Sequence, residues 1–241
     1  MFVFAHAFLG ALIGLGFWQL THDKRAFPFC ILCAILPDLL DKPLAFIFPQ
    51  LFGSGRTLGH AFLIIALAVF LACLFWYYRH SLLGIAGACA LLSHAVLDEM
   101  WGIPSTWYFP FMGPFGREMR PDYLLYSLWR EVSTLSEWVF AFSLVILIPA
   151  LYPELTRYAP FSRKTIHAAR YPAYALLVVA GIALILPSTG LVAPTVFAPS
   201  YAPSTGFMAG VLALGGLFCI HTLYQRGLFT LQHRALDKNR P

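Results

Sequence analysis

Histidine and aspartate residues recur at short spacings in the first half of an otherwise apolar chain. His94 and Asp98 are four residues apart in the stretch SHAVLD, and Asp38 and Asp41 are three apart in PDLLD. These spacings place each pair on one face of a helix. Neutral imidazoles combined with carboxylates form a site for a divalent transition metal, most naturally zinc, with one position left open for water. The predicted metal ligands are His6, Asp38, His60, His94 and Asp98.

Two further residues are candidates for a catalytic role. Asp41 is either another ligand, the general base, or the group that orients a ligating histidine. Arg56 begins the stretch RTLGH and could hold an anionic group such as a phosphate above the same site. Simpler interpretations stay open for single residues: His6 could be an interfacial side chain, Asp38 a helix cap, and Asp98 the partner of a loop arginine.

The overall composition indicates where these residues must lie. Of the 241 residues, 59% are hydrophobic and 11% are charged, and the mean hydropathy is +0.72, whereas a soluble domain has roughly 25% charged residues. So few charges cannot coat a water-soluble globule, and the 22 Phe, 11 Tyr and 6 Trp exclude a disordered or collagen-like chain. Nucleic-acid binding is not expected, because the basic residues lie singly or in pairs between apolar runs. We therefore expect an all-α integral membrane protein, a polytopic transmembrane helix bundle of about six to seven spans.

The apolar runs divide the chain into elements. Segment 27–37 is apolar but short and continues into Pro37 and Asp38, so it is either a short span or a re-entrant segment. Segment 99–135 is aromatic and rich in Pro and Gly, which favours an ordered extramembrane or interfacial loop. The expected organisation is a hydrolase-like helical domain with an outer aromatic loop over 1–135, and three transmembrane helices with a short basic tail over 136–241. The clear candidate spans are roughly 2–20, 60–78, 82–98, 136–152, 172–187 and 205–225.

Counting 27–37 as a crossing gives seven spans, with the two termini on opposite sides of the membrane. Eleven Lys and Arg residues then lie on one side and five on the other. Cytoplasmic loops are enriched in these residues, so the C-terminus is predicted to be cytoplasmic and the N-terminus external. The histidine and aspartate residues of the predicted site all fall on the non-cytoplasmic side. Cys30 and Cys33 have the spacing of a redox or metal motif, but in an apolar run they are interpreted as small residues packed between helices.

Read in order, the motifs are His6, PDLLD from Pro37, RTLGH from Arg56, SHAVLD from Ser93 and the aromatic WYFPF from Trp107. This order resembles the YdjM-like family of membrane-bound metal-dependent hydrolases, over about residues 1–115. In its His and Asp residues that family is similar to the zinc-dependent phospholipase C and P1-nuclease group, so the resemblance implies phosphoester chemistry. The family element HRxxTHS reads GRTLGHA here, with Gly55, Gly59 and Ala61 in place of His, Thr and Ser. This departure implies one metal fewer, a changed substrate or a relic site.

The leading interpretation is an integral membrane hydrolase that uses metal-activated water on a phosphoester. A lipid phosphoester is the favoured substrate class, because the predicted site opens at the bilayer surface beside an aromatic loop. An ion- or metal-handling transporter is one alternative, although it predicts polar residues spread through the membrane depth. A non-catalytic membrane protein with a degenerate site is the other.

Overall fold

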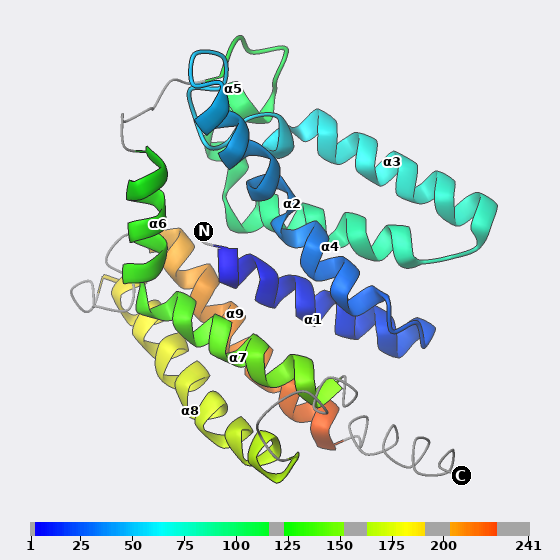
Figure 1. Ribbon diagram of the computed structural model, residues 1–241, viewed down its shortest axis with the longest axis vertical. Helices are drawn as coiled ribbons and strands as arrows, with labels where there is room; N and C mark the ends of the chain where they lie inside the picture. Colours follow the sequence, from blue (N-terminus) through cyan, green and yellow to red (C-terminus); the bar gives the residue numbers. More distant parts are fainter. Residues whose placement is uncertain (1–2, 116–122, 152–162, 191–202, 226–241) are drawn as a thin grey trace.

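The structure is a computed structural model that describes residues 3–115, 123–151, 163–190 and 203–225, and every regular element in these ranges is helical. Short elements lie between the long helices: the 3₁₀ turns η1 (Leu58–His60) and η2 (Met100–Gly102), and the helices α5 (Pro104–Trp107) and α6 (Tyr123–Ser133). The long helices (Figure 1) are α1 (Val3–Thr21), α2 (Ala26–Ile47), α3 (Phe62–Arg79), α4 (Leu83–Leu97), α7 (Leu135–Leu151), α8 (Arg163–Ser188) and α9 (Pro203–Gln225).

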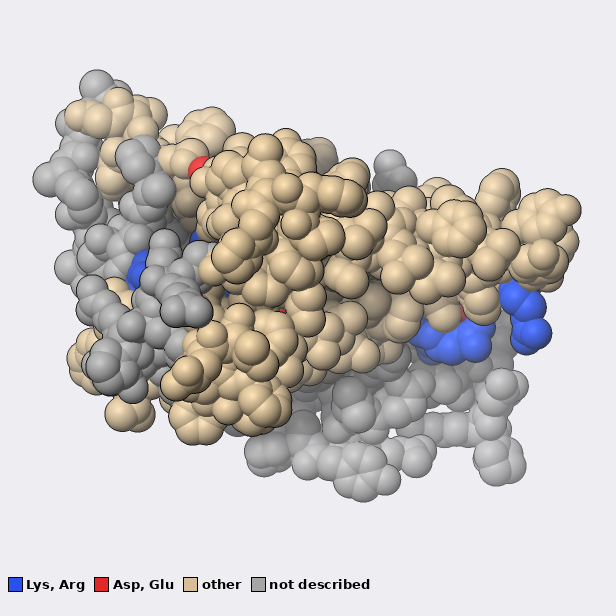
Figure 2. Space-filling view, turned by 90° about the horizontal axis from the view of Figure 1, so that it is seen from above, with Lys and Arg blue, Asp and Glu red and all other residues tan. Residues whose placement is uncertain are grey.

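Several of these helices have the length and hydropathy of a membrane span. Helices α1 and α3, residues 168–188 of α8 and residues 204–222 of α9 are apolar and long enough to cross a bilayer, and α4 and α7 are apolar but shorter. Figure 2 shows a face of the molecule that is almost free of charged side chains, with Lys and Arg gathered toward its two ends. The predicted all-α transmembrane bundle is therefore confirmed.

Segment 27–37 is neither a short span nor a re-entrant segment, because it is the first half of a continuous helix. Helix α2 has 22 residues and continues through both Pro37 and Pro43. At about 1.5 Å per residue it is roughly 33 Å long, close to the thickness of the hydrocarbon core. Each proline removes one backbone N–H from the helix, which a packed membrane helix tolerates better than an isolated one. The interpretation as a short segment was wrong because it treated Pro37 as the end of the helix.

Small residues bring α1, α2 and α4 close together. A Cβ atom on Gly10 of α1 would lie 2.6 Å from the Cys30 carbonyl oxygen and from Ala34 Cβ, and one on Gly14 would lie 2.7 Å from Phe27 Cα. Only glycine therefore fits at these two crossings of α1 and α2. Cys30 is buried and belongs to the same small-residue contact with α4, and Cys30 and Cys33 are both free thiols, as expected.

The C-terminal helices share a hydrophobic core with α1. The Phe8 and Phe140 rings lie 5.3 Å apart, and Phe8 also packs against Gly216 of α9. Leu177 of α8 and Ala213 of α9 are buried in the same core. The division of the chain near residue 135 stays a prediction, and the predicted basic tail, residues 226–241, lies outside the described residues.

The segment 99–135 is more regular than the predicted loop. It contains η2, α5 and the 11-residue helix α6, with residues 116–122 outside the description. Helix α6 was missed because the Pro and Gly residues earlier in the segment dominated its interpretation. The spacing of Leu125, Leu128, Trp129 and Val132 is the i, i+3, i+4, i+7 pattern of a helix and was the available signal.

Candidate metal centre

The histidine and aspartate residues that the sequence singles out meet at one end of the bundle. This end contains the start of α1, the second half of α2, the turn η1 and the end of α4 (Figure 1). All six residues are at most 6% exposed. They are His6, Asp38, Asp41, His60, His94 and Asp98, hereafter the His–Asp cluster.

Asp41 fixes the position and the tautomer of His60. Its Oδ2 atom lies 2.7 Å from His60 Nδ1 and accepts the Thr57 N–H at 2.6 Å, while Oδ1 accepts the Gly59 N–H at 2.9 Å. A carboxylate is only an acceptor, so His60 donates through Nδ1, and in the neutral imidazole its Nε2 carries a lone pair. Of the three roles left open for Asp41, these contacts fit the orientation of a histidine.

A backbone carbonyl does the same for His94. Its Nδ1 lies 2.6 Å from the Ala34 oxygen, which can only accept, so Nε2 again carries a lone pair. The Nε2 atoms of His60 and His94 face each other at 3.0 Å. Two lone pairs at this distance repel unless a proton or a cation lies between them. Two nitrogen ligands of one tetrahedral zinc ion are about 3.3 Å apart, given Zn–N bonds of about 2.0–2.1 Å.

His6 completes a stack of rings beside these two nitrogens. Its ring lies 3.8 Å from that of His94, and its Nε2 lies 3.2 Å from Asp98 Oδ1. The buried Nδ1 atom of His6 has no hydrogen-bond partner among the described residues. A buried polar atom without a partner is energetically costly. Coordination of a metal ion is one way in which this nitrogen could gain a partner.

The geometry offers two overlapping sets of donor atoms. In one set, His6, His94 and Asp98 each place a ligand atom within 4.8 Å of the others, and in the second set Asp38, His60 and His94 do so. His94 belongs to both. Each set could hold a metal ion, and together the two sets contain all five residues predicted as ligands. Asp41 lies behind His60, outside both sets.

Two cationic side chains cover the carboxylates of the cluster. Arg56 Nε lies 2.9 Å from Asp98 Oδ2, and Lys42 Nζ lies 2.9 Å from Asp38 Oδ2. Their side chains are 37% and 30% exposed, whereas the carboxylates they contact are nearly buried. Arg56 lies beside the cluster, and its contact with Asp98 is also the one expected if Asp98 is the partner of a loop arginine. Lys42 was missed, although its position four residues after Asp38 on one helix was a usable signal.

The departures from the family motif have a local explanation at one position. A Cβ on Gly59 would lie 3.0 Å from Pro37 Cα and 3.1 Å from the Pro37 carbonyl oxygen. The turn η1 therefore packs directly on α2. This close packing allows the Gly59 N–H to donate to Asp41. Gly59 is the residue that lets His60 approach α2 so closely. Nothing in the structure explains Gly55 or Ala61.

Two glutamates that sequence reasoning also missed hold the start of α1. Glu137 of α7 is buried and accepts the N–H groups of Phe4 and Ala5, and Glu131 of α6 accepts that of Val3 at 2.8 Å. The first N–H groups of a helix have no partner within the helix, so these carboxylates cap α1 immediately before His6. Burial raises the pKa of the Glu131 carboxyl above its ordinary value, and the nearby Lys42 ammonium acts against this rise.

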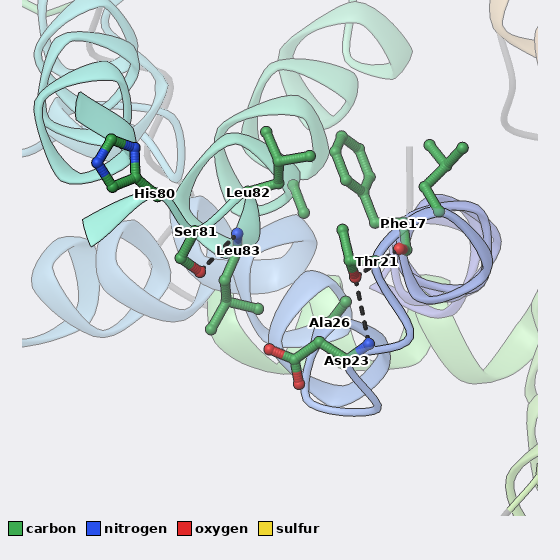
Figure 3. A pocket seen from close by; sticks show the side chains of 10 residues that line it. Phe17, Thr21, Asp23, Ala26, His80, Ser81, Leu82 and Leu83 are labelled. Carbon is green, nitrogen blue, oxygen red and sulfur yellow. Dashed lines mark hydrogen bonds between the residues drawn. The ribbon is translucent and has the colours of Figure 1, made fainter. Parts of the chain in front are cut away.

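A separate pocket of about 370 Å³ lies at the opposite end of α1 (Figure 3). The two hydroxyl groups that line it are occupied locally: Thr21 Oγ1 accepts the Asp23 N–H, and Ser81 Oγ accepts the Leu83 N–H. The Arg25 guanidinium pairs with Asp23 and holds the pKa of that carboxyl below its usual value. The pocket contains no group of candidate metal ligands among the described residues.

The sequence matches the family model described as YdjM inner membrane protein over residues 1–224. The chain belongs to the YdjM family. The resemblance inferred from the motifs is thus confirmed, but its extent was underestimated: the match continues through the three C-terminal spans, which were expected to lie outside it. No curated protein and no solved structure matches the chain. The protein is accordingly a multi-pass inner membrane protein with buried His and Asp groups that could hold a metal ion.

Proposed function

We propose that this YdjM-family protein is a metal-dependent hydrolase of phosphoesters, with zinc as the metal and a lipid phosphoester as the favoured substrate class. The observation that carries the proposal is the pair of His60 and His94 Nε2 atoms, 3.0 Å apart. Both lone pairs are directed at the same point because Asp41 and the Ala34 carbonyl occupy the two Nδ1 atoms. Metal-binding histidines in proteins are oriented by carboxylates and carbonyls in this way.

The charges around the cluster also suit a divalent cation. Three carboxylates, Asp38, Asp41 and Asp98, lie with two cations, Lys42 and Arg56, in direct contact with two of them. With neutral histidines the sum of these five groups is one negative charge. A divalent cation reverses that sign and offsets the cost of burying the carboxylates.

The residues in and around the cluster would have different roles in the reaction. A zinc ion bound here supplies Lewis acidity and lowers the pKa of water to about 7. His6, Asp38, His60, His94 and Asp98 would hold the ion, and Asp41 orients His60. Arg56 and Lys42 are the partly exposed cations at the cluster, so they would bind the phosphate group of an incoming substrate.

The position of the cluster favours a hydrolase over a transporter. The six residues lie at one end of the bundle and are not distributed through its depth. A transport pathway for ions or protons requires polar groups at several depths in the spans. A cluster at one end gives access from one side only, which is suited to a reaction at the membrane surface.

The test is hydrolysis by the full chain purified in detergent, with and without added zinc. The substrates are bis(p-nitrophenyl) phosphate and a short-chain phosphatidylcholine. We expect zinc-dependent hydrolysis that is lost in His94→Ala and kept in His221→Ala, a matched histidine on α9 beside the Tyr174 ring. Equal hydrolysis by His94→Ala, or none by the zinc-loaded protein on either substrate, would contradict the proposal.

A further inference from the structure

Helix α6 has its apolar side chains on the outside. Leu125, Leu128, Trp129 and Val132 follow the i, i+3, i+4, i+7 pattern, so they form one stripe along the helix. In a helix that packs on a soluble protein such a stripe faces the core. Here all four side chains are between 54% and 71% exposed.

The polar side of α6 faces the protein. Tyr126, Arg130 and Glu131 are half-buried. Glu131 accepts the Val3 N–H at the start of α1, and the Arg130 guanidinium lies 5.8 Å from the centre of the Tyr126 ring. The Glu131 contact with α1 therefore places the polar side of the helix against the bundle, and its apolar stripe is directed away from the bundle.

The placement of α6 indicates what covers that stripe. The helix has 11 residues, about 16 Å, which is too short to cross a bilayer. In Figure 1 it lies across the end of the bundle that holds the His–Asp cluster, at a large angle to α1 and α4.

The stripe is also continuous with an apolar surface of a membrane helix. Trp138 and Val145 are exposed on α7, which follows α6 directly. Trp138 Nε1 donates to the Val132 carbonyl at 2.8 Å, joining the end of α6 to this surface. The outward side chains of α7 are in contact with acyl chains in any bilayer-embedded state, so the same environment extends to α6.

We infer that α6 is an in-plane interfacial helix, with Leu125, Leu128, Trp129 and Val132 inserted among the acyl chains of the leaflet that borders the His–Asp cluster. Amphipathic helices of this kind lie at the boundary between headgroups and acyl chains, and Trp is enriched there. On the opposite face Glu131 accepts the Val3 N–H, three residues before His6, so α6 lies beside the cluster. The mouth of the cluster is therefore at headgroup depth. This inference does not depend on a bound metal or on hydrolysis.

Site-specific photo-crosslinking tests the inference on the full chain. The photoreactive residue p-benzoylphenylalanine replaces Leu125, Leu128, Trp129 or Val132, one at a time, in vesicles of phosphatidylethanolamine and phosphatidylglycerol labelled in the acyl chain. The exposed Val145 on α7 is the positive control, and the inward-facing Tyr126 on α6 is the matched negative control. All four test positions are exposed, so the label replaces no buried contact.

We expect labelled-lipid adducts at the four stripe positions at the level of Val145, and several-fold fewer at Tyr126. Adducts to a second copy of the chain or to another protein at the stripe positions would overturn the inference. Absence of lipid adducts along α6 while Val145 gives them would overturn it too, as would equal labelling of Tyr126 and the stripe.

Discussion

The neighbours of each histidine decide which of its nitrogens is available to a metal. His60 and His94 have different partners, a carboxylate and a backbone carbonyl, yet both partners occupy Nδ1 and leave Nε2 directed into the cluster. The sequence could predict that these histidines share a site, because their helices place them at one membrane face. It could not predict the tautomers, since the Ala34 carbonyl is a backbone group that no side-chain motif reveals.

Substitutions of Asp98 and of Arg56 should have different effects on metal content and turnover, although the two side chains contact each other. Asp98→Asn keeps the shape but removes the charge, so we expect metal content to fall to background while the helices stay inserted. Arg56→Ala should retain the metal and reduce phosphoester turnover by roughly ten- to a hundredfold, because a partly exposed cation is screened by solvent. Elemental analysis and turnover measurements on the same preparations check both.

The control for Arg56 is Arg25→Ala, which breaks an arginine–aspartate pair at the far end of the bundle and should change neither quantity. If Asp98→Asn keeps wild-type metal content, Asp98 is a structural partner of Arg56 and not a ligand.

Asp41 should act only through His60. Asp41→Asn leaves one acceptor oxygen for three donors, and its amide can donate to His60 Nδ1 and favour the wrong tautomer. We expect a loss of roughly 10–100-fold in zinc affinity with the ligands intact, measured by competition with a chelating dye. An unchanged affinity together with lost turnover would instead assign Asp41 as the general base.

At the scale of elements, close packing of the helices determines where each candidate ligand lies relative to the others. Gly10 and Gly14 bring α1 against α2, and Ala34 on the same face of α2 supplies the carbonyl for His94. The bounds of the long apolar helices were predictable from hydropathy to within a few residues, except that α8 begins at Arg163, nine residues before the predicted start of that span. The continuation of α2 past Pro37 was not, because a local rule for proline is overridden by packing against α1 and α4. The capping of α1 by Glu131 and Glu137 was not predictable either, because these glutamates lie far from α1 in the sequence.

The two glycines Gly10 and Gly16 of α1 allow a matched comparison. A Cβ on Gly10 would meet backbone and side-chain atoms of α2 at 2.6 Å, whereas one on Gly16 would meet nothing within 4 Å. Gly10→Ala should lower the free energy of unfolding by about 1–3 kcal/mol through overpacking, and Gly16→Ala should leave it unchanged or raise it by up to about 1 kcal/mol. Denaturation in SDS, followed by circular dichroism, measures both. Equal effects of the two changes would show that α1 and α2 do not meet at Gly10.

At the scale of the whole molecule, α9 begins beside the cluster and runs away from it. Ser204 and Thr205 at its start donate to Glu99, the residue after Asp98. The end of α9 therefore lies at the opposite end of the bundle, together with the turn between α1 and α2 (Figure 1). Lys24 and Arg25 lie in that turn, and Arg79 ends α3 at the same end. The count of seven crossings stays a prediction, because α2 is not among the helices that have both the length and the hydropathy of a span.

The side of the membrane on which the cluster lies stays a prediction from the lysine and arginine distribution. We expect a cytoplasmic C-terminus and a cluster on the non-cytoplasmic side. A fusion of alkaline phosphatase after Pro241 should be inactive, and the same reporter placed between α8 and α9 should be active. A C-terminal fusion that is active would invert the topology and move the cluster to the cytoplasmic face.

The most direct test of the metal centre is the metal content of the purified full chain, measured by elemental mass spectrometry after dialysis against metal-free buffer. We expect about one or two zinc ions per chain in the wild type and in His221→Ala, and only background in His94→Ala, which removes the one residue shared by both sets of donor atoms. Equal metal content in the wild type and in His94→Ala, or no metal retained by the wild type after incubation with zinc, would contradict the assignment of the His–Asp cluster as a metal centre.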